Sequence, residues 1–262
     1  MRVSRDPTSA LPFGNLVTES PATPWSIDEF TERLRNVGRE QYHDRHPFHE
    51  LMNDGNLDRE QLRVWVANRF YYQKIIPIKD AIVMSRCPDR NIRRRWIQRI
   101  VDHDGQLLPD GTVEPGGIEK WLRLGEALGL TREELESEQL LLPAVRYSVD
   151  AYLHFVSTRP WVIAIASSLT ELFAPKLMAR RLEAFERHYT FIDPAALAYF
   201  RARLTQAPRD SDHALAIVHA RCTTLAEQQA AVGAIEFKCD LLWAQLDAIY
   251  FHCVQPTRPA PA

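Results

Sequence analysis

The sequence has few cysteines, no long hydrophobic run and no apolar leader. Its 262 residues include four cysteines, at positions 87, 222, 239 and 253, without a CxxC pair or a metal-finger spacing. Such cysteines are typical of a reduced cytoplasmic protein. No apolar run approaches the roughly 18 residues of a membrane span, and the N-terminus lacks the apolar core of a signal peptide. We therefore expect a cytoplasmic protein without a membrane partner.

An excess of charge of one sign is also lacking. The chain carries 32 basic and 34 acidic residues, for a net charge of -2, which excludes a global basic field for nucleic acid. The basic residues are 27 arginines and 5 lysines. This skew fits genomic base composition, because the two residues are nearly equivalent on solvated surfaces. The alternative is that some arginines grip carboxylates or phosphates in a bidentate manner.

Common cofactor and metal motifs are missing. The sequence has no GxGxxG, Walker or GxSxG pattern. His43, His46 and His49 have a spacing that suggests a metal site, but Pro47 interrupts it, which favours a solvated or capping role. Asp210 and His213 are three residues apart, yet a metal site needs further ligands from other helices. We therefore expect no metal.

Helical periodicity dominates the chain, and the 45% hydrophobic content is ample for one core. Proline-rich ends predict flexible tails at 1–25 and 255–262, and 26–254 is expected to form a single all-helical domain. The predicted fold class is all-α, a compact multi-helix bundle. Helix starts are indicated by a capping residue three positions before Glu or Gln, at Ser26, Asp58 and Thr131.

Further helices follow from spacing. They are expected at about 89–105, 118–129, 143–158 and 160–173, followed by three C-terminal helices broken near Pro194, Pro208 and Thr224. The stretch 105–117 is rich in Gly, Pro and Asp and is expected to be a lid or surface loop.

Several polar residues fall on faces where a helical bundle requires apolar ones, and burying them costs free energy unless they find partners. Arg99 and His103 share the stripe of Ile92 and Trp96, although a lone histidine there is often a satisfied core residue. Lys238 lies mid-stripe in the last helix, where the alternative is a side chain that snorkels to the bundle edge. Similar anomalies are Arg69, Tyr72, Gln73, Tyr199, Arg203, Glu171, Tyr42 and His43. Together they indicate a polar cavity for an anionic, planar ligand.

These residues lie in blocks that resemble the pyrroloquinoline-quinone synthase family. The blocks are WVANRFYYQ, IPIKDA, WIQRIVDHDG, GGIEKWLRLGEALGL, VDAYL, SSLTELFAP, YFRARLTQ and EFKCDLLWAQLDA, and the likeness covers about Phe30 to Ala248. It implies a heme-oxygenase-like fold related to TenA proteins and a homodimer. It also implies the final step of pyrroloquinoline quinone (PQQ) biosynthesis without metal or organic cofactor. In that step O2 oxidises a tricarboxylated bicyclic precursor by eight electrons with ring closure, and H2O2 is released.

The resemblance also implies roles for individual residues. His103 matches the histidine that transfers protons, Tyr199 and Arg203 match the pair beside the oxygen site, and Lys238 matches the lysine at the quinone oxygens. Other matches to substrate-binding positions are Tyr42, His43, Arg69, Tyr72, Gln73, Arg99, Tyr152, Thr170, Glu171 and Arg181.

One position departs from the family pattern. Met178 stands where the family has a histidine near dioxygen, and a thioether cannot relay protons as imidazole does. We expect a tolerated substitution with slower oxidation. The alternatives are a paralogue with altered chemistry and a PQQ-binding protein that does not catalyse. A thiaminase would need a cysteine nucleophile in the pocket, and a diiron oxidase would need the ligand that Gln206 replaces.

Overall fold

The computed structural model describes residues 23–255. The tails expected at 1–25 and 255–262 therefore lie largely outside the described residues. Trp25, inside the first of them, is held by the last helix: its backbone N–H donates to Gln228 Oε1 at 2.8 Å, and Gln228 Nε2 donates to its carbonyl at 3.1 Å. The bundle thus engages the chain before the first helix begins.

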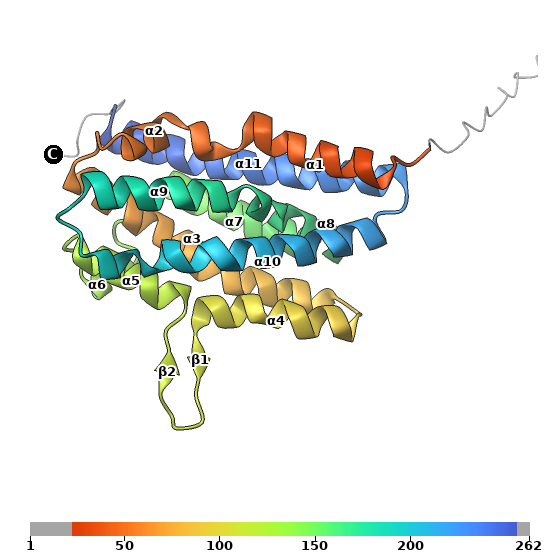
Figure 1. Cartoon of the computed structure of the whole chain (residues 1–262), viewed down its shortest axis with the longest axis horizontal. Helices are drawn as coiled ribbons and strands as arrows, with labels where there is room; N and C mark the ends of the chain where they lie inside the picture. Colours follow the sequence, from red (N-terminus) through yellow and green to blue (C-terminus); the bar gives the residue numbers. More distant parts are fainter. Residues whose placement is uncertain (1–22, 256–262) are drawn as a thin grey trace, which may run out of the picture.

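The described chain is mainly helical, with one short two-stranded hairpin, which confirms the predicted all-α class (Figure 1). Within residues 23–255 no single helix is long and apolar enough to cross a membrane; one bent pair of helices passes that test only when its members are taken together.

The α-helices are α1 (Ile27–Gln41), α2 (Pro47–Asn53), α3 (Arg59–Arg86), α4 (Arg90–Asp104), α5 (Gly117–Ala127), α6 (Arg132–Glu136), α7 (Pro143–Thr158), α8 (Trp161–Ala166), α9 (Ala174–His188), α10 (Ala198–Arg221) and α11 (Leu225–Cys253). The 3-10 helices are η1 (His43–Arg45), η2 (Ser167–Leu172) and η3 (Pro194–Leu197).

The predicted helix starts are confirmed. Ser26 accepts from the Glu29 amide, and Asp58 and Thr131 form complete capping boxes. Helix α4 ends at Gly105, whose φ of 92° is a backbone conformation that favours glycine.

Two predicted boundaries are wrong. Residues 160–173 do not form one α-helix, because α8 passes into the 3-10 helix η2 at Ser167. The Ser167 hydroxyl donates to the Ala164 carbonyl at 2.6 Å, so it competes for an acceptor of the helix backbone. The break expected at Pro208 is absent, since Pro208 lies inside α10. Tertiary packing of α10 on α9, α8 and η2 outweighs the backbone hydrogen bond that proline removes.

The stretch 105–117 contains a β-hairpin rather than only irregular chain. Strand β1 (Gln106–Leu107) pairs antiparallel with β2 (Val113–Glu114). At the tip, Asp110 Oδ1 accepts from the Thr112 amide at 3.0 Å, and Gly111 has a φ of 83°. The hairpin projects away from the helices (Figure 1). Two residues per strand are too few to leave an alternating pattern in the sequence.

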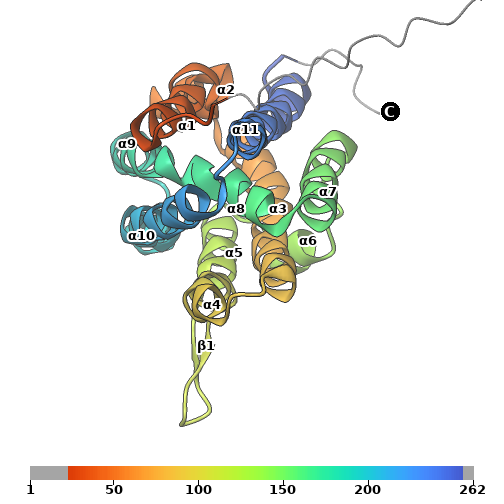
Figure 2. The same cartoon turned by 90° about the vertical axis from the view of Figure 1, so that its right-hand side faces the viewer.

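The segment α8–η2 lies at the centre of the bundle, with the longer helices around it (Figure 2). From Ile163 to Thr170 every residue is buried, which agrees with the mostly apolar or small side chains of this stretch. An aromatic cluster of Trp65, Trp121 and Phe200 joins the surrounding helices α3, α5 and α10. The end of η2, which contains Thr170 and Glu171, therefore lies in the interior of the bundle.

Candidate active site

A cavity with about 420 Å³ of free space, including its opening, lies between the central η2 and the surrounding helices. Most of the residues predicted for the site line it. The lining is Tyr42, His43, Arg69, Tyr72, Ile76, His103, Thr170, Glu171, Ala174, Met178, Tyr199, Arg203 and Leu242. Helices that are far apart in the sequence thus bring the predicted residues together.

The remaining predicted residues lie outside this lining, and all of them except Arg181 contact it. Gln73 accepts a hydrogen bond from Tyr199 at 2.9 Å, and Arg99 pairs with Glu171 at 3.6 Å. Tyr152 stacks on Tyr72 with ring centres 6.4 Å apart. Lys238 Nζ lies over the ring of Tyr72, whereas Arg181 contacts His49 and Trp65, which do not line the cavity. The structure thus brings all the predicted residues except Arg181 to the cavity lining or into contact with it, and their roles stay predictions.

His103 is held as a neutral base. Its Nδ1 lies 2.9 Å from the Arg99 carbonyl, which only accepts, so Nδ1 carries the proton and Nε2 has a free lone pair. Burial, together with the nearby Arg203 charge, lowers the pKa of His103 to about 4. Gly117 on α5 packs on both side chains: a Cβ there would lie 3.3 Å from the Tyr199 ring, a tight contact, and 3.5 Å from the His103 ring, an ordinary one. The imidazole is therefore fixed, neutral and ready to accept a proton.

Tyr199 and Arg203 are one turn apart on α10, beside His103. The Tyr199 ring packs edge-on against Trp121 at 5.0 Å. Burial raises the pKa of Tyr199, so the phenol stays protonated. Arg203 is ion-paired with Glu171 and is 4% exposed. A protonated phenol and a permanent cation thus border the same part of the cavity.

Arg99 takes part in a network of buried ion pairs. Arg99 Nε lies 3.3 Å from Asp80 Oδ2, and Arg99 Nη1 lies 3.1 Å from Asp210 Oδ2. Lys79 Nζ lies 2.6 Å from Asp80 Oδ1. Burial raises the pKa of Asp80, but Arg99 and Lys79 outweigh it and hold the value below the usual range. Arginine and lysine cations therefore neutralise the carboxylates of this network.

Lys238 is a buried amine without a hydrogen-bond partner among the described residues. Its side chain is 1% exposed, and among the described residues its Nζ has no hydrogen-bond partner. It lies 3.1 Å from the ring centre of Tyr152 and 4.3 Å from that of Tyr72. Burial lowers its pKa well below the usual value, and the charges of Arg69 and Lys79 lower it further. The alternative that Lys238 snorkels to the edge of the bundle is wrong.

Arg181 and Arg69 are also without a carboxylate partner among residues 23–255. Arg181 donates to His49 Nε2 at 2.8 Å, and its guanidinium carbon lies 4.9 Å from the ring centre of Trp65. Burial, followed by the charge of Arg69, lowers the pKa of Arg181 to about 9. Arg69 donates to Gln245 Oε1 at 3.2 Å. With Lys238, these cations give the site a positive potential that an anionic ligand would neutralise.

The histidine series 43, 46 and 49 is only partly as expected, since all three side chains are buried rather than solvated. His46 does cap a helix, because its Nδ1 accepts from the Phe48 amide at 3.0 Å. His49, which the sequence did not place at the site, contacts Arg181. In the part of the chain that the structure describes, no group of three or more His, Cys, Asp or Glu side chains is arranged to hold a metal ion.

Sequence reasoning also missed the apolar part of the cavity. Ile76, Ala174 and Leu242 line it, and as ordinary core residues they carry no signal in a single sequence. Met178 lies among the lining residues and is 8% exposed. A thioether therefore occupies a wall of the cavity.

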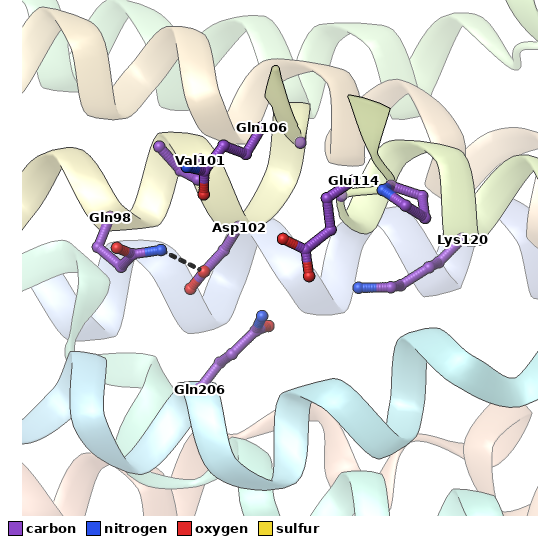
Figure 3. A pocket seen from close by; sticks show the side chains of 10 residues that line it. Gln98, Val101, Asp102, Gln106, Glu114, Lys120 and Gln206 are labelled. Carbon is purple, nitrogen blue, oxygen red and sulfur yellow. Dashed lines mark hydrogen bonds between the residues drawn. The ribbon is translucent and has the colours of Figure 1, made fainter. Parts of the chain in front are cut away.

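A second hollow lies on the solvent side, where the hairpin leaves α4 (Figure 3). Its polar lining includes Asp102, Glu114 and Lys120, and Gln98 Nε2 donates to Asp102 Oδ1 at 3.0 Å. Gln206 lines it as well and accepts from Arg203 Nη1 at 3.4 Å. The Arg203–Gln206 contact thus lies between this hollow and the central cavity.

Solved structures define the class of fold. A protein domain from Shewanella denitrificans, described as having a heme oxygenase-like fold and unknown function, superposes with a TM-score of 0.67. The match covers 89% of this chain and 96% of that one, at 15% sequence identity. The predicted heme-oxygenase-like fold is therefore confirmed, and this likeness establishes the fold alone.

Sequence comparison defines the family. The model described as the TENA/THI-4/PQQC family matches residues 31–248, and the chain belongs to this family. The pyrroloquinoline-quinone synthase of Xanthomonas campestris pv. campestris (strain B100) is 51% identical over 231 residues, which cover 88% of this chain and 90% of that protein. The bifunctional coenzyme PQQ synthesis protein C/D of Methylorubrum extorquens is 50% identical over 236 residues, or 90% of this chain. The chain spans 62% of that longer relative.

Proposed function

We propose that this chain is a pyrroloquinoline-quinone synthase. It would catalyse ring closure and eight-electron oxidation of the tricarboxylated bicyclic precursor by O2, with release of H2O2. The observation that carries this proposal is the set of three buried or half-buried cations without carboxylate partners, Lys238, Arg181 and Arg69, around a cavity that also contains neutral His103. The names of relatives at about 50% identity support the same activity.

The residues of the site have properties that suit this chemistry. His103 Nε2 accepts a proton from the bound precursor, which leaves its conjugated anion more electron-rich. That anion delivers electrons to O2, and Arg203 and Tyr199 stabilise the reduced oxygen species by charge and by proton donation. The unpaired cations orient the carboxylates of the precursor.

The proposal includes no metal and no organic cofactor. Asp80, Asp210 and Glu171 are already paired with arginine, so they do not offer free carboxylates to a cation. The unpaired cations also raise the potential in the cavity, which disfavours a further positive ion. Metal analysis of the purified protein tests this point, and two equivalents of iron required for activity would contradict it.

The direct test of the function is to mix the protein with the bicyclic precursor in air. We expect quinone absorbance to appear with release of H2O2. A precursor that binds but stays unconverted would contradict the synthase proposal.

Replacing Lys238 by methionine is expected to weaken binding of PQQ by about tenfold or more, because a charged hydrogen bond to the ligand is lost. The same change is expected to raise the free energy of unfolding by about 1 to 3 kcal/mol, since a buried amine without a hydrogen-bond partner is removed. Ligand titration and urea denaturation measure the two effects. The exposed Lys176 on α9 provides the control, K176M. Unchanged affinity in K238M would contradict the role of Lys238.

Met178 favours a second candidate function, a PQQ-binding protein or a paralogue with altered chemistry. If the chain is instead a slow synthase, Met178→His is expected to raise the rate of O2 consumption by about tenfold, because imidazole restores a proton relay. Met178→Leu keeps an apolar wall and serves as the control. Absence of turnover in the wild type and in M178H would favour the binding protein.

We further propose that the chain acts as a homodimer in the cytoplasm. Tyr147 on α7 is 70% exposed, and Leu140, which precedes α7, is 41% exposed; both provide apolar surface for a second copy. All four cysteines are free, as in a reducing compartment. Light scattering after size exclusion measures the oligomeric state.

A further inference from the structure

His49 lies outside the cavity lining but contacts two residues of the site. It is on α2, is 2% exposed and lies between Arg181 on α9 and His43 in η1. Its Nε2 is 2.8 Å from Nη2 of Arg181, and its Nδ1 is 2.9 Å from the backbone oxygen of His43. The same Nδ1 lies 3.4 Å from Nδ1 of His43. Both ring nitrogens are therefore engaged.

These contacts allow one tautomer only. A guanidinium group donates and never accepts, so His49 Nε2 must be the unprotonated acceptor. A carbonyl oxygen only accepts, so His49 Nδ1 must carry the proton. The ring is therefore neutral, and its two nitrogens differ in function, because Nε2 holds a cation and Nδ1 holds the backbone of η1.

Arg181 depends on this contact because it has little else to fix its direction. Among the described residues it makes no ion pair, and its Nε has no hydrogen-bond partner. Trp65 restrains one side of the guanidinium through its ring face. A neutral acceptor such as imidazole fixes the cation without neutralising it, whereas a carboxylate in the place of His49 would cancel the charge.

We propose that His49 is a positioning residue that aims Arg181, still fully charged, at a carboxylate of the bound ligand and secures the neighbouring His43. This inference rests on the proposed function, because it takes a polycarboxylate as the ligand. It assigns to α2 a role in binding, although no side chain of α2 lines the cavity.

Two substitutions separate the two contacts of His49. Glutamine reaches the position of Nε2 and retains an acceptor for Arg181, whereas asparagine reaches the position of Nδ1 and retains a donor for the His43 carbonyl. With PQQ as the probe, we expect His49→Asn to raise the Kd by about 10- to 100-fold, as for loss of a charged hydrogen bond. His49→Gln should stay within about threefold of the wild type. The KM for the precursor should follow the Kd, with a smaller change in kcat.

A double-mutant cycle with Arg181→Gln tests whether His49 acts through Arg181. In the R181Q background, H49N should cause no further loss of affinity. The control is His213→Asn, since His213 is also a buried histidine but packs on Trp96 away from the cavity lining. Equal affinities of H49N and the wild type, or losses that add in the cycle, would overturn the role of His49.

Failure of the inference about His49 can be distinguished from failure of the proposed function. If the wild type itself does not bind PQQ, the proposed function fails. Nitrogen-15 NMR of the histidine rings tests the inference even if H49N does not fold. We expect the wild type to contain a neutral His49 protonated at Nδ1, with an Nε2 resonance that moves in R181Q; protonation at Nε2 would overturn the inference.

Discussion

Replacing His103 by alanine is expected to lower turnover by about 10²- to 10⁴-fold while PQQ binding stays nearly unchanged. The reason is that Nε2 is the free base of a neutral ring, and the contact of Nδ1 with Arg99 fixes its direction. Single-turnover kinetics and a ligand titration measure the two quantities. The pH profile of kcat/KM reports on the free protein. The decrease on its acidic side that is due to His103 should be centred near the pKa of this residue, about 4, whereas the usual pKa of histidine is 6.5.

The matched variant is His103→Asn, whose amide retains the donor to the Arg99 carbonyl but removes the base. We expect it to lose turnover as alanine does. Wild-type rates in either variant would contradict the role of His103. A large loss of ligand affinity in both would mean that the ring binds the substrate instead of moving its proton.

Replacing Asp80 by asparagine is expected to lower the free energy of unfolding by about 3 to 5 kcal/mol, because Arg99 and Lys79 lose a buried counter-charge. Urea denaturation measures the change. The control is Glu183→Gln at the exposed pair with Arg187, where we expect a loss below about 1 kcal/mol. Equal effects at the two sites would contradict the network.

The pH dependence of the Asp80 contribution has a definite sign. The pKa of Asp80 is lower in the folded protein than the usual 3.8. Its contribution is therefore fully present above that value and is lost as the pH falls through the lower folded value. D80N should lack this acid-side loss. If D80N lost as much stability at acidic pH as the wild type does, other carboxylates would be the cause of that loss.

Much of the site could be predicted from one sequence because polar residues in buried stripes are conspicuous. Arg99 and His103 share a stripe that is apolar otherwise, and Lys238 interrupts another. The capping residues Asp58 and Thr131 likewise mark helix starts through local hydrogen bonds that the sequence encodes directly. Where the cause of a feature is local, the sequence is sufficient.

The features that were missed depend on tertiary contacts. The acceptor role of His49 exists only because α9 brings Arg181 within 2.8 Å. The persistence of α10 through Pro208 depends on packing against neighbouring helices. The apolar lining residue Leu242 resembles any other core residue until the cavity is seen. Such features are set by residues far away in the chain, so a single sequence does not reveal them.

The most direct test of the central claim is one experiment on metal-free protein. The bicyclic precursor is first bound in the absence of O2, and air is then admitted while quinone absorbance and H2O2 are recorded together. The account predicts that the precursor binds but stays unoxidised until air enters, and that PQQ and H2O2 then form without added metal. A precursor that remains unconverted in air, or that converts only after iron is supplied, would contradict it.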